Sequence, residues 1–292
     1  MSKKLLLVLL ALSLAAGLAF AQKRALGSEE NPIVWAFVPS GEMERVSAGA
    51  QQVADLLHDK TGYYFKTLVA TEYAGVIEAL RASPPSAHMT SLATFAYIMA
   101  ADMGVSRAAL VSVRNKSPFY KGEIIARAGS GITKIADLKG KTFAFGSVSS
   151  TSGHLMPRFY LREQGIDPDR DMRVAFSGAH DATAFQVQGG KVDAGALNIS
   201  VWNKMIEEKK IDPSTLRVFY TTPPYFDYNW TVRGDLDPAL IAKLREAFLA
   251  LDPARPADKA LLDLQRASRF IPTKVENYRG IEAAARSAGL LK

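Results

Sequence analysis

The sequence of 292 residues contains no cysteine and only four histidines. Without cysteine, the chain can form no disulfide, thiolate metal site, cysteine nucleophile or lipidated cysteine anchor. The histidines, His58, His88, His154 and His180, show no H-E-x-x-H or paired spacing, so we predict neither a metal site nor a cofactor. Stability must therefore come from an apolar core, and the chain is long enough to bury one.

Long apolar runs are also scarce, and the one that stands out lies at the N-terminus. Lys3 and Lys4 precede an apolar stretch that ends at Leu18, and the small-x-small pattern Ala19-Phe20-Ala21 follows. This order predicts a cleaved signal peptide over residues 1–21. The alternative, a membrane anchor, needs a longer apolar run. Export without a lipid anchor indicates a freely diffusing periplasmic protein.

The formal charge of +7 is spread along the chain. Apart from the pair Lys209 and Lys210, basic residues do not cluster, and no basic run is interleaved with aromatic residues. The distribution disfavours a nucleic-acid partner and is compatible with small anions as ligands.

Segments with strand and helix patterns alternate along the sequence. The apolar run at residues 33–38 is typical of a buried parallel strand, and a helical spacing follows at residues 42–57. The same order recurs at residues 63–69 and 71–81, at 88–92 and 93–103, and at 142–145 and 154–161. The alternation predicts an α/β fold with mainly parallel sheets.

Two polar, proline-bearing joints suggest that the chain crosses between two lobes. The first is Asn115-Lys116-Ser117-Pro118, and the second includes Pro223 and Pro224. We expect lobe 1 to contain residues 22–114 and 231–292, lobe 2 residues 122–219, and the hinge crossovers residues 115–121 and 220–230.

The turn Ser150-Thr151-Ser152-Gly153 is the strongest local signal for a site. It follows the strand pattern Thr142 to Phe145 and leads into a helix pattern. Backbone N–H groups, rotatable hydroxyls and the positive end of a helix dipole together suit an oxyanion. An ordinary helix cap explains the same residues equally well. A nucleotide P-loop is excluded, because no lysine follows in the G-x-x-x-x-G-K-[ST] pattern.

Other strand-to-helix turns carry further candidate ligand-binding residues. His180 lies in SGAHDATA and Tyr73 in TEYAGVIEAL, while Ser91 and Thr94 bracket a third turn. Each of these side chains can donate a hydrogen bond into a cleft. The alternatives are capping residues and, for Tyr73, a half-buried aromatic ring.

Asp227 and Tyr228 lie in the second crossover, where both lobes would meet a ligand. An aspartate there can accept a hydrogen bond from a protonated oxyanion or from a ligand ammonium. The alternative is a salt bridge at the hinge. Trp35, Trp202 and Trp230 are expected to pack in the core or at the hinge.

An enzyme would need a nucleophile and a base. Ser150 or Ser152 with His180 and Asp227 would make a triad, but the sequence has no G-x-S-x-G elbow. We therefore expect no catalytic residues, and a secreted serine hydrolase is the alternative from another functional class.

These segments, read together, resemble the PhnD-like family of periplasmic proteins of ABC transporters that bind phosphate, phosphite or phosphonate. The similar segments are TEYAGVIEALR, LATFAYIMA, DLKGKTFAFGSVSSTSGHLMPRFYL, SGAHDATAFQVQGGKVDAGAL and PPYFDYNW. The resemblance covers nearly all of the chain after the predicted signal peptide. It implies a type II periplasmic binding fold, in which two α/β lobes close on a ligand.

The resemblance also implies roles for individual residues. It assigns phosphoryl-oxygen contacts to Ser150, Thr151 and Ser152, places His180 and Tyr73 at the ligand, and matches Asp227 to an acidic position that some relatives use for a P–OH or an amine. One turn departs from the family pattern, because Ser91-Leu92-Ala93-Thr94 stands where several relatives have an aromatic residue and a glycine-containing turn.

The partners implied by this resemblance are a small phosphorus oxyanion and, transiently, the permease and ATPase at the inner membrane. We expect a monomer. The alternative in the same fold is a ligand-sensing periplasmic subunit of a two-component system.

Overall fold

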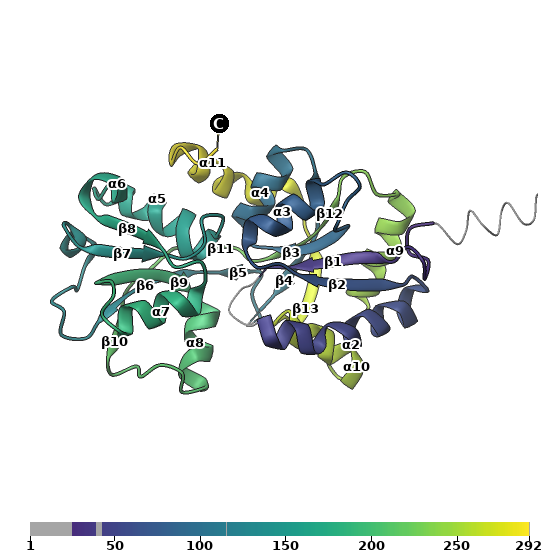
Figure 1. Ribbon diagram of the computed structural model, residues 1–292, viewed down its shortest axis with the longest axis horizontal. Helices are drawn as coiled ribbons and strands as arrows, with labels where there is room; N and C mark the ends of the chain where they lie inside the picture. The colour runs from purple at the N-terminus through teal and green to yellow at the C-terminus, as the bar shows by residue number, and fades with distance from the viewer. Residues whose placement is uncertain (1–24, 39–42, 115, 292) are drawn as a thin grey trace, which may run out of the picture.

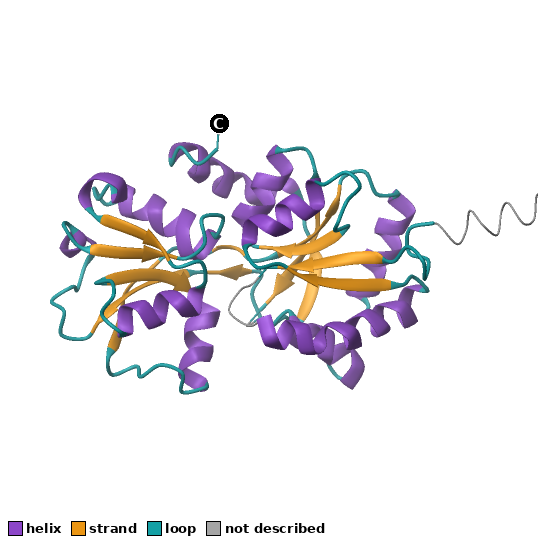
Figure 2. Cartoon of the chain, in the orientation of Figure 1, coloured by secondary structure: helices purple, strands orange, loops and turns teal. Residues whose placement is uncertain are grey.

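The computed structural model describes residues 25–38, 43–114 and 116–291, so the predicted signal peptide lies outside the described residues. The chain forms two α/β lobes that lie side by side (Figure 1). Each lobe has a central sheet with helices on both faces (Figure 2). Among the described residues, no helix has the length and apolarity needed to cross a membrane.

The sheet of lobe 1 has six strands in the order β13-β4-β12-β3-β1-β2. Strand β1 (Ile33–Phe37) is parallel to both β2 (Phe65–Val69) and β3 (Met89–Leu92). The remaining pairs are antiparallel; they involve β4 (Ser106–Val113), β12 (Asn229–Arg233) and β13 (Arg269–Pro272). The insertion of β12 between β3 and β4 brings the end of the chain back into this lobe.

The sheet of lobe 2 has five strands in the order β10-β6-β9-β7-β8. Strand β7 (Thr142–Phe145) is parallel to β8 (Arg173–Phe176) and to β9 (Ala194–Asn198). The other two strands, β6 (Gly122–Arg127) and β10 (Leu216–Thr221), pair antiparallel. The predicted α/β class is confirmed, but the sheets are mixed and not mainly parallel, because strands next to the crossovers run against the βα units.

The two crossings between the sheets pair with each other. Strand β5 (Phe119–Tyr120) and strand β11 (Tyr225–Phe226) form a two-stranded antiparallel ribbon. The ring centroids of Phe119 and Phe226 lie 4.5 Å apart, and those of Tyr120 and Tyr225 lie 4.7 Å apart. Lys121 separates this ribbon from lobe 2, because β5 ends before it and β6 begins after it.

Helices cover both faces of each sheet, as Figure 1 shows. They are α2 (Met43–Thr61), α3 (Tyr73–Arg81), α4 (Thr94–Asp102), α5 (Met156–Glu163), α6 (Pro168–Asp171), α7 (His180–Gln188), α8 (Ile199–Glu207), α9 (Pro238–Leu249), α10 (Pro256–Leu264) and α11 (Arg279–Ser287), with shorter turns at η1 (Ile135–Leu138), η2 (Thr151–Leu155) and η3 (Val275–Tyr278). As predicted, Trp35, Trp202 and Trp230 are buried.

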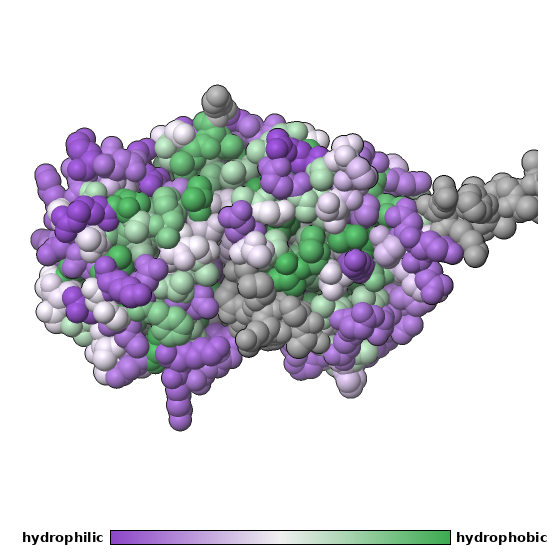
Figure 3. Space-filling view, viewed as in Figure 1, coloured by the Kyte–Doolittle hydropathy of each residue, from purple (hydrophilic) through white to green (hydrophobic). Residues whose placement is uncertain are grey.

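The C-terminal helix α11 contacts both lobes, since it packs on α4 of lobe 1 and on α5 of lobe 2. Arg286 Nη2 lies 3.0 Å from Asp102 Oδ1 in lobe 1, and Arg162 Nη1 of lobe 2 donates to the carbonyl of Ala288 at 3.1 Å. Hydrophobic residues gather in the region of α11, whereas the far ends of both lobes are largely polar (Figure 3). The helix therefore links the lobes outside the crossover ribbon.

Candidate functional site

Four of the predicted site residues are the first residues of helices. Tyr73 begins α3, Thr94 begins α4, Thr151 begins the π-helical turn η2 that continues into α5, and His180 begins α7. Each helix follows a strand of the same lobe. The first N–H groups of a helix have no partner within the helix and carry its positive dipole end, so these starts are suited to an anion.

The hydroxyl turn of lobe 2 is buried and meets lobe 1 directly. Ser150 Oγ accepts a hydrogen bond from Gly153 N at 3.0 Å, which is an N-cap contact. Thr151 Oγ1 accepts one from Phe95 N at 2.7 Å, and Phe95 is the second residue of α4. Ser149 and Ser152 are also buried. Ser150 therefore acts as the cap that the sequence allowed, while Thr151 joins the two lobes.

His180 presents a hydrogen-bond donor beside this turn. Its Nδ1 accepts the N–H of Asn198 at 3.3 Å, so in the neutral ring the proton resides on Nε2. Burial, followed by the charge of Arg266, lowers the pKa of His180 to about 3, which keeps the ring neutral. Among the described residues, the buried Nε2 has no hydrogen-bond partner. A Cβ at Gly153 would lie 3.0 Å from His180 Cε1, so the ring lies against the turn.

The tyrosines of the candidate site form a pair across lobe 1 and the hinge. Tyr73 Oη and Tyr228 Oη lie 3.1 Å apart, and both side chains are buried. Burial raises the pKa of each phenol, so both remain uncharged hydroxyl groups. The structure thus brings together two residues that are far apart in the sequence.

Ser91 and Thr94 are bonded to acceptors within the protein. Ser91 Oγ donates to Gln265 Oε1 at 2.5 Å, and Thr94 Oγ1 donates to the carbonyl of Phe226 at 2.7 Å. These hydroxyl hydrogens hold the α4 turn to neighbouring elements of lobe 1 and the hinge. In this arrangement neither hydroxyl hydrogen is directed at a ligand.

Asp227 is fully buried and forms an ion pair at the hinge. Its Oδ1 accepts from Arg114 Nη1 at 2.7 Å and from Tyr228 N at 2.7 Å. Among the described residues, its Oδ2 has no hydrogen-bond partner. Burial raises the pKa of the Asp227 carboxyl, and the charge of Arg114 opposes that shift. The hinge salt bridge considered from the sequence is therefore present, and it involves only one of the two carboxylate oxygens.

Three residues that lie near this site were not identified from the sequence: Arg114, Gln265 and Arg266. Arg114 directly follows β4, before the first crossover, and its Nε donates to the carbonyl of Gln265 at 2.9 Å. Arg266 lies close enough to lower the pKa of His180, and its backbone has a φ of 50° in the turn after α10. The turn that carries Gln265 and Arg266 shows no motif, so only the fold reveals its place beside the hinge.

The contacts do not build the catalytic triad drawn from the sequence. In such a triad, the histidine Nδ1–H donates to the aspartate. Here His180 Nδ1 is an acceptor for a backbone N–H, and Asp227 is paired with Arg114. The hydroxyl of Ser150 caps its own helix turn. The arrangement suits holding an anion and not activating a serine.

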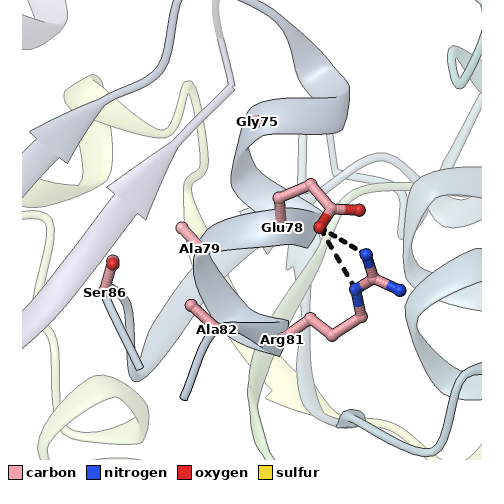
Figure 4. Close-up of a pocket in the computed structure, with 6 residues that line it drawn as sticks. All are labelled: Gly75, Glu78, Ala79, Arg81, Ala82 and Ser86. Carbon is pink, nitrogen blue, oxygen red and sulfur yellow. Dashed lines mark hydrogen bonds and ion pairs between the residues drawn. The ribbon is translucent and has the colours of Figure 1, made fainter. Parts of the chain in front are cut away.

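A separate surface depression lies along α3 and the turn that follows it. It is lined by Gly75, Glu78, Ala79, Arg81, Ala82 and Ser86 (Figure 4). Arg81 Nη2 and Glu78 Oε2 form an ion pair at 2.8 Å there, and both side chains are more than half exposed. Because these two charges pair with each other in solvent, the depression is a weak candidate for binding an anion compared with the buried groups around Tyr73.

The fold is that of a two-lobed periplasmic binding protein. The structure of PhnD1 from Prochlorococcus marinus in complex with methylphosphonate superposes with a TM-score of 0.80 at 25% sequence identity, and the match covers 88% of this chain and 98% of that one. This likeness confirms the predicted fold.

The family follows from the sequence. The family described as "ABC transporter, phosphonate, periplasmic substrate-binding protein" matches residues 35–278, and the chain belongs to it. A probable phosphite-binding protein of an ABC transporter from Prochlorococcus marinus is 36% identical over 169 residues, which are 56% of this chain and 57% of that relative. The match thus spans little more than half of that relative's length. The phosphate-import protein PhnD of Mycolicibacterium smegmatis is 28% identical over 228 residues, 74% of this chain and 70% of that protein.

Proposed function

We propose that this protein captures a small phosphorus oxyanion between its two lobes and delivers it to the permease of an ABC transporter. The observation that carries the proposal is the buried His180 Nε2–H, a donor without a partner among the described residues, next to the hydroxyl turn at Ser150. A buried donor of this kind is costly unless something accepts its hydrogen bond. Family membership points to a phosphorus oxyanion as the acceptor.

The ligand contacts divide between the lobes. On the lobe 2 side, we propose that the oxygens of the anion contact Ser150, Thr151, Ser152 and His180. On the side of lobe 1 and the hinge, we propose contacts with the N-terminal ends of α3 and α4 and with Tyr73, Ser91, Thr94, Asp227 and Tyr228. Groups from both lobes reach an anion only when the lobes close. The ligand stabilises the closed state by its higher affinity for that state, and no covalent step is needed.

The bond from Phe95 N to Thr151 Oγ1 supports this view of closure. It joins the start of α4 in lobe 1 to the start of η2 in lobe 2, which are two positive helix ends. An anion between these ends offsets the repulsion between them. We therefore propose that the ligand strengthens a contact that the closed lobes already make.

Calorimetric titration tests the ligand class. Phosphite, methylphosphonate and phosphate are titrated into the protein at neutral pH, with sulfate as the competing tetrahedral anion. We expect heat from at least one phosphorus ligand and a weaker response to sulfate. Binding of sulfate alone, or of none of the four, would refute the proposal.

Replacing Thr151 by valine should weaken the bound phosphorus ligand roughly tenfold to hundredfold, because one charge-assisted hydrogen bond contributes about 1.5–3 kcal/mol. The variant keeps the shape of the side chain and removes its hydroxyl. Thr221→Val, at an exposed end of β10, is the matched control and should bind as the wild type does. An unchanged affinity in Thr151→Val would place the site elsewhere. Turnover of an activated ester that disappears in Ser150→Ala would favour the hydrolase.

A further inference from the structure

The ion pair between Arg114 and Asp227 at the hinge affects which phosphorus oxyanions the site can bind. This inference rests on the proposed function. Arg114 is held on three sides: Nη1 bonds Asp227 at 2.7 Å, Nε bonds the carbonyl of Gln265 at 2.9 Å, and the guanidinium carbon lies 4.8 Å from the ring centroid of Tyr228. A planar guanidinium with these contacts is fixed in position. It therefore cannot swing away to leave Asp227 to another cation.

The carboxylate of Asp227 lies in the field of two guanidinium groups. Arg114 is bonded to Oδ1, and the charge of Arg266 also lowers the pKa of Asp227, so both cations are near. Arg266 acts in the same direction on His180 of lobe 2, which is itself uncharged. A ligand that approaches Oδ2 thus meets a carboxylate whose negative charge is already matched.

The two kinds of donor that a phosphonate offers to Oδ2 differ in charge. A P–OH group of a monoprotonated oxyanion is a neutral donor, and it completes the hydrogen bonding of Oδ2 without adding a cation. A ligand ammonium would place another positive charge beside Arg114 and within the field of Arg266 in a buried site, where an unmatched charge is costly. The first arrangement is favourable and the second is not.

We propose that Arg114 is a specificity-determining residue that selects phosphorus oxyanions with uncharged substituents and disfavours phosphonates that carry an ammonium group. It acts by neutralising Asp227, the acidic residue that would otherwise attract the amine. Asp227 then serves as an acceptor for P–OH.

Calorimetric titration with methylphosphonate and aminoethylphosphonate tests this selectivity. The wild type should bind aminoethylphosphonate at least about tenfold more weakly. In Arg114→Gln, the carboxylate loses its partner, and the preference for methylphosphonate should shrink by at least about tenfold or reverse. In the double variant Arg114→Gln/Asp227→Asn, which removes both charges together, aminoethylphosphonate should lose this gain. Arg173→Gln, at an exposed position of β8, controls for the change in net charge and should keep the wild-type preference.

Two results would overturn the proposal. One is equal affinity of the wild type for both ligands, and the other is an unchanged preference in Arg114→Gln. If Arg114→Gln does not fold, the wild-type ratio and the double variant decide the question, since the double variant leaves no unpaired buried charge. Failure of methylphosphonate, phosphite and phosphate to bind at all would overturn the proposed function together with this inference, whereas equal affinity for the two probes overturns the selectivity alone.

Discussion

Gly153→Ala should abolish most of the affinity for the phosphorus ligand while the protein remains folded. A Cβ at this position would lie 3.0 Å from Cε1 and 3.1 Å from Nδ1 of His180, and 3.1 Å from Ser150 Oγ. The ring and the hydroxyl would both have to give way by a few tenths of an ångström. Complete loss of both charge-assisted hydrogen bonds would cost about 3–6 kcal/mol, on the order of a hundredfold to ten-thousandfold in affinity, and this is the upper bound of the effect. Calorimetric titration with methylphosphonate or phosphite measures the loss.

Gly280→Ala provides the matched control for this substitution. Gly280 lies in α11, and a Cβ added there would meet no heavy atom of another element within 4 Å, so an alanine methyl group points into open space. Alanine there should leave affinity unchanged and stabilise the helix by up to about 1 kcal/mol. A thermal melt of both variants separates a local effect from unfolding. If Gly153→Ala binds within about threefold of the wild type while remaining folded, His180 does not contact the ligand.

The sequence predicts those site residues that lie where a strand is followed by a helix. The patterns of SSTSG, SGAHD and TEYAG each contain the first residue of a helix, and the structure places Thr151, His180 and Tyr73 at those first residues. Local patterning finds such positions because a helix start follows a strand end within a few residues. Their partners come from elsewhere: Phe95 N reaches Thr151 from the other lobe, and Asn198 N sets the tautomer of His180.

Arg114 and Gln265 could not be predicted in the same way. Their bond joins the end of β4 to the turn after α10, which are 151 positions apart in the chain. Neither residue belongs to a spacing that a helix or strand would show. The antiparallel pairs in both sheets could not be predicted either. Side chains alternate with a period of two in parallel and antiparallel sheets alike, so the sequence pattern does not reveal the direction of pairing. Short elements such as α6 and β11 were missed, since four or two residues carry too little periodicity.

Acidification should destabilise the protein through two buried histidines. His154 Nε2 accepts from Arg158 Nε at 2.9 Å, and Nδ1 lies 2.5 Å from the carbonyl of Val148, so the ring is held neutral. Burial lowers the pKa of His154 to about 4 and that of His180 to about 3, from an ordinary value of 6.5. Between pH 6.5 and the lowered pKa of each histidine, the unfolded chain binds a proton that the folded protein does not. The stability of the protein therefore falls as the pH falls below about 6.5. The loss is about 3 kcal/mol from His154 by about pH 4, and His180 adds a similar amount.

Glu123 acts in the opposite direction, and the experiment must separate the two effects. Burial raises the pKa of the Glu123 carboxyl from 4.5 to about 7, so the folded protein binds a proton there before the unfolded chain does, and stability rises as the pH falls through this range.

His154→Gln removes one histidine and can keep both hydrogen bonds, with its amide oxygen facing Arg158 and its amide nitrogen facing Val148. Urea unfolding at several pH values between about 7 and 4 should show an acid-induced loss in this variant that is smaller than in the wild type by about 2–3 kcal/mol. Glu123→Gln should increase the loss, because the opposing proton uptake is gone. Parallel curves for the wild type and His154→Gln would show that His154 is protonated in the folded protein and does not govern its acid stability.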